Sequence, residues 1–172
     1  LRWCEEFLHN LSDEPPTALR TGGIGVRDLK RIAEHLGVDE TCAGFVAELC
    51  YLGGLVVIDS DDQILPTSAF DIWLTKTAEE RWYSLVVLWL DTSRVSGLIG
   101  KVGDKSIAPL GPELDRAGAC LIRRTTLKVL SENQQICPDI KSIQEIVKWW
   151  NPQRANSDFV EWSLREAEWL GI

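Results

Sequence analysis

Five short segments follow one another between residues 17 and 67, and their order limits the folds open to this chain. An extended stretch precedes a helix predicted from Val26, where apolar residues recur about every 3.6 positions until Gly37. After a short turn, a second helical stripe follows Asp39, a residue suited to cap it. Two apolar runs then flank the acidic turn 60–63. A helix, a turn, a second helix and a hairpin in this order predict a winged helix-turn-helix unit.

Further helices are predicted beyond the hairpin, and capping residues mark where they start. Ser68 is the expected cap of a short helix, and Thr77 of the strong helix 78–91. This strong helix is apolar on most sides, so we expect it to belong to the core. Ser157 or Asp158 is the expected cap of the last helix of the chain.

The second half of the chain repeats the helical pattern of the first. Both Glu48–Gly53 and Glu166–Gly171 read Glu, two residues, an aromatic, Leu and Gly. The composition between the copies changes to Gly, Ser, Lys and Pro, which predicts a flexible linker or surface loop. The fold class predicted is mainly α with a small β-wing, as tandem winged helix-turn-helix-like units of which the second is incomplete. The predicted domains are a winged-helix unit with supporting helices over 1–91, a linker over 92–112 and a second unit over 113–172.

Charge and hydropathy narrow the classes of partner and location. A formal net charge of −8 disfavours nonspecific attraction to a phosphate backbone. Because the acidic excess lies mostly in residues 1–70, a DNA-facing patch is expected to be local. No apolar run has the length of a membrane span and no signal peptide opens the chain, so we expect a cytoplasmic protein without a membrane partner. The absence of Met indicates a piece of a longer protein.

The residues that usually carry metal or nucleophilic chemistry are scarce and scattered. The two histidines, His9 and His35, have no second His or Cys at ligand spacing. Gly97–Lys101 resembles a phosphate loop only faintly, because the spacing of its glycines and the residue after the Lys are wrong. We therefore expect no metal, no cofactor and no catalytic residue. The cysteines are in no CxxC pair and are expected to be buried thiols: Cys4, Cys42, Cys50, Cys120 and Cys137.

Three separated segments resemble the bacterial helicase-associated family in the same order: Leu19–Arg31, Leu65–Leu74 with Glu80–Trp82, and Leu164–Gly171. Members are long proteins with a helicase conserved C-terminal domain similar to that of XPB-type DNA repair helicases. The resemblance implies a noncatalytic region of a DNA-processing protein. Because this chain carries no motor motif, any ATPase of the parent protein would lie elsewhere.

Two hypotheses about function remain, and the first is DNA binding. Arg27, Lys30 and Arg31 are spaced to emerge from one helix face, opposite the apolar stripe. As a set they are candidates for phosphate contacts, although any one of them could simply belong to a solvated face. The candidates for nucleic-acid contact are Arg20, Arg27, Lys30, Arg31, Arg123, Arg124, Lys128 and Trp149.

The second hypothesis is a protein interface, with the remainder of the parent helicase-like protein or another protein as partner. The second helix of the pair carries acidic residues and no Lys or Arg, whereas base reading uses Arg, Lys, Asn or Gln. The expected exposed side of that helix comprises Glu40, Ala43, Gly44, Ala47, Glu48 and Tyr51. Of these, the candidate interface residues are Glu40, Glu48 and Tyr51.

Trp149 and Trp150 cannot both face one core, because neighbours on a helix point about 100° apart. Trp150 continues the apolar stripe of its helix, so Trp149 is the candidate for stacking on a base or packing on a partner. The alternative is that Trp149 packs against the helix 78–91.

Overall fold

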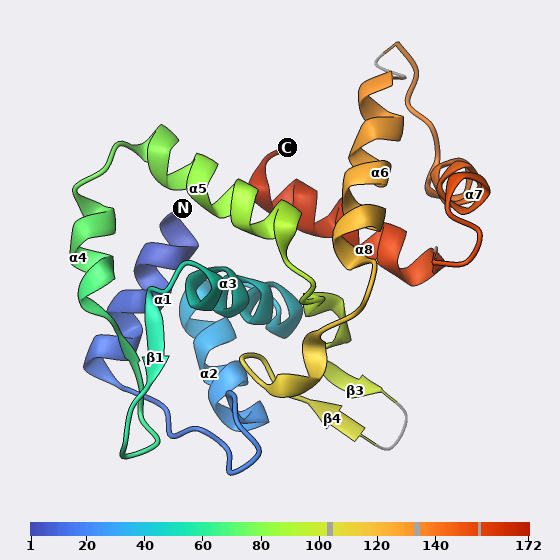
Figure 1. Ribbon diagram of the computed structural model, residues 1–172. Helices are drawn as coiled ribbons and strands as arrows, with labels where there is room; N and C mark the ends of the chain where they lie inside the picture. The colour runs from blue at the N-terminus through green and yellow to red at the C-terminus, as the bar shows by residue number, and fades with distance from the viewer. Residues whose placement is uncertain (103–104, 133–134, 155) are drawn as a thin grey trace.

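The computed structural model describes residues 1–102, 105–132, 135–154 and 156–172, and it is mainly helical (Figure 1). Two small antiparallel sheets of two strands each accompany the helices. The α-helices and strands are α1 (Arg2–Asp13), α2 (Val26–Leu36), α3 (Glu40–Leu52), β1 (Val56–Ile58), β2 (Ile64–Pro66), α4 (Ser68–Leu74), α5 (Ala78–Asp91), β3 (Gly100–Val102), β4 (Lys105–Ile107), α6 (Ala119–Glu132), α7 (Ile140–Trp150) and α8 (Ser157–Leu170). Two 3-10 turns, η1 (Ser96–Leu98) and η2 (Pro112–Leu114), lie between α5 and α6.

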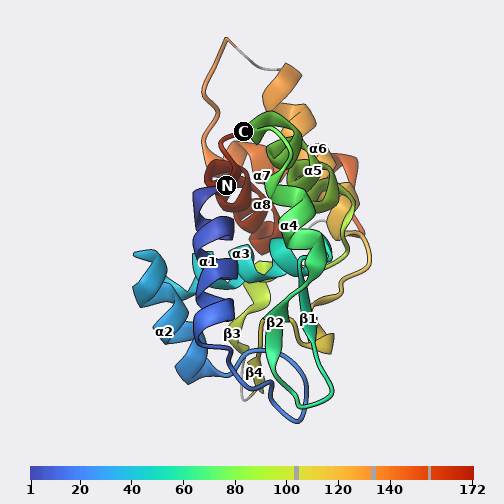
Figure 2. The same cartoon turned by 90° about the vertical axis from the view of Figure 1, so that its left-hand side faces the viewer.

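The first group of elements follows the order predicted for residues 17–67. Helix α2 ends at Gly37, whose φ of 66° is the left-handed conformation expected of a helix-ending glycine. Asp39 caps α3 by accepting a hydrogen bond from the backbone N–H of Cys42 at 2.8 Å. Strands β1 and β2 pair antiparallel, and the extended Thr17 bridges Gln63 beside them. Figure 2 shows this hairpin lying along α1.

The predicted helix starts are accurate to about one residue. Thr77 caps α5 in a reciprocal capping box with Glu80, as expected. Helix α4 is capped by Thr67 instead of Ser68, because the Thr67 hydroxyl accepts from Ala69 N–H and donates to the Gly54 carbonyl. Helix α8 is capped by Asn156, one position before the residues predicted.

Residues 92–112 form more structure than the predicted linker. They contain η1 and the hairpin of β3 and β4, and four of their apolar side chains are buried: Val95, Leu98, Ile107 and Leu110. The glycines in this segment allow close packing, since a Cβ on Gly97 would collide with the indole of Trp162 on α8. Residues 92–102 and 105–112 therefore include packed structure between the two halves of the chain, where the sequence predicts a flexible linker or surface loop.

Helix α3 lies at the centre of the molecule (Figure 1). It packs against α1 and α2 on one side and against α5 and η1 on the other. Every residue from Cys42 to Cys50 is buried. Ile99 closes over Gly44, and the ring of Phe45 lies 5.4 Å from that of Trp169 on α8. The prediction that Ala43, Gly44, Ala47 and Glu48 form an exposed side was wrong, because the second half of the chain covers that side.

The last three helices, α6 to α8, pack around a small core of their own, which comprises Ile122, Val129, Ile143, Val147 and Val160. The end of α8 reaches back to the first half, where the indole N–H of Trp82 donates to the Leu170 carbonyl at 2.7 Å. Helix α5 spans the two halves, and it is buried mainly in its second half, around Trp89, whereas Tyr83 is exposed. Among the described helices, none is long and apolar enough to cross a bilayer.

Candidate nucleic-acid interface

Glu48 is buried inside the molecule and does not belong to a surface. Both of its carboxylate oxygens accept from the Arg94 guanidinium, and one also accepts from the Leu110 backbone N–H. Arg94 donates in addition to the Gly111 carbonyl at 2.8 Å and lies over the ring of Tyr51. Burial lowers the pKa of Arg94, but the hydrogen bond and charge of Glu48 outweigh that effect and raise it overall. The assignment of Glu48 to a partner surface was therefore wrong.

Arg123 is also buried, with only 2% of its surface exposed, so its assignment to nucleic-acid contact was wrong. Its guanidinium donates to the carbonyls of Trp89, Thr92 and Arg94 at 2.7, 2.9 and 3.1 Å. Burial lowers the pKa of Arg123, and the nearby Glu166 carboxylate partly offsets this. The chain between α5 and η1 is fixed in place by these bonds.

Glu166 on α8 plays the same part as Glu48 on α3. It accepts hydrogen bonds from the Trp89 indole at 2.6 Å and from the Ser96 hydroxyl, and it lies 3.5 Å from Arg123. Glu48 and Glu166 are the matching first residues of the repeated sequence pattern. Glu48 therefore ties α3 to Arg94 and Leu110. Glu166 ties α8 to Ser96 and to Trp89 near the end of α5.

Two further cationic candidates on α6 already have partners. Arg124 pairs with Asp91, and Lys128 lies 3.7 Å from Glu132. The Lys128 ammonium also lies 5.4 Å above the ring of Trp150. These side chains are exposed but engaged, so a phosphate would have to displace an acidic or aromatic neighbour.

Exposed cations without such partners among the described residues lie in α2 and in the loop before it. This region, Arg20, Arg27 and Lys30, is called the basic end of α2. Arg20, Arg27 and Lys30 are exposed, and no ion pair involves them in the part of the chain that the structure describes. Arg31 is half-buried and pairs with Glu14 and with Asp28 at 3.3 Å. Of the three α2 residues predicted to contact phosphate, Arg27 and Lys30 therefore have no ion-pair partner among the described residues. Arg31 is already neutralised by its acidic neighbours.

A groove of about 550 Å³ runs beside this end of α2. One wall is the loop that leads into the helix, and the other is the segment around β4 and η2. The loop is held there by a hydrogen bond of 2.9 Å from Ile24 N–H to the Pro109 carbonyl. Gly23 makes this approach possible, since a Cβ there would collide with the same carbonyl and its φ is +88°. The lining comprises Leu19, Thr21, Gly22, Ile24, Val26, Ser106, Ala108, Gly111, Pro112 and Glu113.

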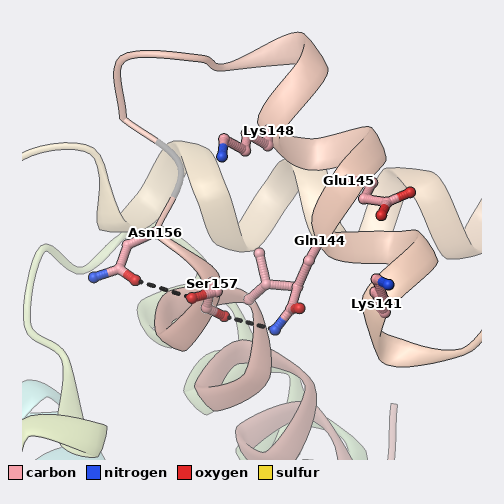
Figure 3. Close-up of a pocket in the computed structure, with 7 residues that line it drawn as sticks. Lys141, Gln144, Glu145, Lys148, Asn156 and Ser157 are labelled. Atoms are coloured by element: carbon pink, nitrogen blue, oxygen red, sulfur yellow. Dashed lines mark hydrogen bonds between the residues drawn. The ribbon is translucent and has the colours of Figure 1, made fainter.

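A second pocket, of about 480 Å³, lies between α7 and the start of α8 (Figure 3). Lys141 and Lys148 lie on either side of Gln144, whose amide donates to the Ser157 carbonyl at 3.2 Å. Glu145 also lines this pocket and offsets part of the positive charge. The pocket lies at the far end of the molecule from α2, so the two basic regions do not form one surface (Figure 1).

Trp149 stands out from α7 with 84% of its surface exposed. Packing against α5, the alternative considered from the sequence, was therefore wrong. Glu40 and Tyr51 are also exposed, but Tyr51 is partly covered by Arg94. Of the cysteines, Cys4, Cys42 and Cys50 are buried as expected, whereas Cys137 is exposed.

The described residues contain no group of three His, Cys, Asp or Glu side chains placed to hold a metal ion. Comparisons with protein-family models, with curated proteins and with solved structures gave no match to this chain. The candidate site consists of exposed cations in α2 and in the loop before it, on the same part of the chain as an apolar groove.

Proposed function

We propose that this chain is a noncatalytic, winged-helix region of a DNA-processing protein that contacts the phosphate backbone through the basic end of α2. The order α1, extended Thr17, α2, α3, β1 and β2 matches the order expected of a winged helix-turn-helix unit, which supports the proposal. The resemblance of three segments to the bacterial helicase-associated family supports the same role. In this proposal the ATPase, where the parent protein has one, lies outside the chain.

The burial of α3 is the main support for the proposal, because a buried helix cannot read base edges and leaves phosphate contacts as the way to bind DNA. A reading helix needs side chains that reach base edges, and α3 offers a continuous buried stretch instead. Arg20, Arg27 and Lys30 can neutralise phosphates without reading a sequence. We therefore expect weak binding that depends on salt and not on DNA sequence.

A titration of labelled DNA at several salt concentrations tests this proposal. Three phosphate contacts predict a slope of log Kobs against log salt of about −3. The double variant Arg27→Ala with Lys30→Ala should reduce that slope by about 2. A control pair with the same change in charge, Lys76→Ala with Arg165→Ala, lies outside the surface and should leave the slope unchanged. Equal slopes for both double variants would rule out contact through α2.

The exposure of Trp149 favours a second function, docking onto a protein. An indole in water is costly for a monomer and is common at protein interfaces. Ile140, in the first turn of the same helix, is also exposed. In this alternative, α7 binds the remainder of the parent protein. Trp149→Ala should then abolish binding in trans to that remainder, whereas Tyr83→Ala, which removes an exposed aromatic on α5, should not. Equal binding by both variants would refute it.

A further inference from the structure

The pocket between α7 and α8 is lined mainly by polar side chains (Figure 3). Asn156 and Ser157 line it from the start of α8, and the buried Val160 adds one apolar side chain. Helix α7 lines it with four residues spaced i, i+3, i+4 and i+7, which share one face of the helix: Lys141, Gln144, Glu145 and Lys148. The pocket therefore suits a polar ligand.

The charge of this lining favours an anion. Lys141 and Lys148 outnumber the one acidic lining residue, Glu145, which leaves one positive charge in excess. Neither lysine forms an ion pair with any residue that the structure describes, whereas Lys128 on α6 is paired with Glu132. The two lysines are separated by about 10 Å along the helix axis, a distance that their flexible stems can close around one ligand. Both ammonium groups of the pocket are therefore open to an anionic ligand.

Neutral donors stand beside the lysines. The Asn156 side-chain oxygen caps α8 by accepting from the Asp158 N–H at 3.0 Å, which leaves the N–H groups of the same amide for another acceptor. The Ser157 hydroxyl makes only a long hydrogen bond of 3.4 Å to the Asp158 carboxylate, which is not part of the lining. The Gln144 amide is already used, because it donates to the Ser157 carbonyl and joins the two helices. A phosphate group, with its charge and several acceptor oxygens, matches this set of donors.

We propose that the pocket between α7 and α8 binds a phosphate group, held by Lys141 and Lys148. A DNA strand and a free phosphorylated molecule present the same group, so the test compares both sources. The site goes beyond the proposed function and does not depend on it, because the pocket lies at the far end of the molecule from α2 (Figure 1). With DNA as the source, the chain would hold its nucleic acid at two separate places.

The test titrates the ¹⁵N-labelled chain with inorganic phosphate at constant ionic strength and follows the backbone amide signals by NMR. We expect saturable shifts at Gln144, Lys148 and Ser157. Lys148→Gln should weaken phosphate binding about tenfold, because it removes a charged hydrogen bond. Glu145→Gln should strengthen binding, because it removes the acidic side chain of the lining. The control Lys76→Gln, which removes an exposed lysine outside the pocket, should leave the affinity unchanged.

Equal affinities of the wild type, Lys148→Gln and Glu145→Gln would overturn the phosphate site, as would equal shifts with sodium acetate. A second titration, with a short thymidine oligonucleotide, identifies the source of the phosphate. Shifts at the same amides that saturate at lower concentration than with inorganic phosphate indicate a DNA strand, and their absence indicates a free phosphorylated molecule. The double variant Arg27→Ala with Lys30→Ala should leave phosphate binding in the pocket unchanged. DNA binding that this double variant weakens and Lys148→Gln does not, with no phosphate shifts, would overturn the pocket and keep the proposed function.

Discussion

Replacing Arg94 by Met should destabilise the fold more than any surface substitution. Glu48 is only 3% exposed, and the substitution would leave its charge facing the Leu110 backbone N–H without a cation. Breaking a buried ion pair from one side typically costs about 3–5 kcal/mol, because the remaining charge stays desolvated. Met retains much of the apolar stem, so the loss should come from charge and not from an empty cavity.

A double variant separates the cost of the unpaired Glu48 charge from the cost of the Arg94 contacts that are lost. Arg94→Met combined with Glu48→Leu replaces the pair by apolar side chains, an exchange that is often neutral or stabilising in buried ion pairs. We therefore expect the double variant to be more stable than Arg94→Met alone, an interaction that additive single effects could not produce. Urea unfolding followed by far-UV circular dichroism gives both free energies of unfolding, with the slope m as a check on two-state behaviour.

The matched control is Arg124→Met, which breaks the exposed pair with Asp91. Water solvates the Asp91 carboxylate after the substitution, so the unfolding midpoint should hardly move. If Arg94→Met shifts the midpoint no more than Arg124→Met does, then Glu48 is not desolvated. The Glu48–Arg94 pair would then not be what holds Arg94 and its neighbours against α3.

Three further outcomes follow from local geometry. Thr77→Ala removes the hydroxyl that caps α5 and should cost about 1 kcal/mol of unfolding free energy in the same urea assay. Gly97→Ala would force a methyl group into the Trp162 indole, and it should lower the melting temperature and increase the exposure of Trp162 to fluorescence quenchers. Burial raises the pKa of Cys42 to about 12, so at pH 8 iodoacetamide should modify Cys137 first and spare Cys42 until the chain unfolds, as mass spectrometry of digests would show.

The elements that the sequence predicts well are those fixed by local interactions. Gly37 and Asp39 bound the turn between α2 and α3 because a left-handed glycine and a side-chain cap act within a few residues. The hairpin after α3 and the capping box at Thr77 are similarly local. Exact starts of α4 and α8 differ by one residue because neighbouring Ser, Thr and Asn side chains compete to cap the same N–H groups.

Which face of each helix is buried could not be predicted from local interactions. Glu48 and Arg123 carry full charges, which usually indicates exposure. Their partners lie far away in the sequence: Arg94 binds Glu48, and backbone carbonyls in the last turn of α5 and just beyond it accept from Arg123. The matching positions of Glu48 and Glu166 in the repeat were the available signal, because surface acids need not recur in two copies of a helix end.

The sequence alone also predicts two separate units joined by a loop, whereas in the structure the two halves pack on the residues between them. Composition marks 92–112 as a loop, but Val95 and Leu98 supply apolar contacts and Arg94 the charge that Glu48 requires. The basic end of α2 was identified from helical spacing, whereas the groove beside it depends on β4 and η2 and had no signature in the sequence.

The layer formed by 92–112 has a consequence for how such a protein can change over evolutionary time. A fragment ending before it would expose the side of α3 that Ile99 and Trp169 now cover, and would leave Glu48 without its cation. The two halves of the chain therefore depend on each other for the burial of α3 and for the charge balance of Glu48. A substitution at these contacts in either half is constrained by the residues of the other half.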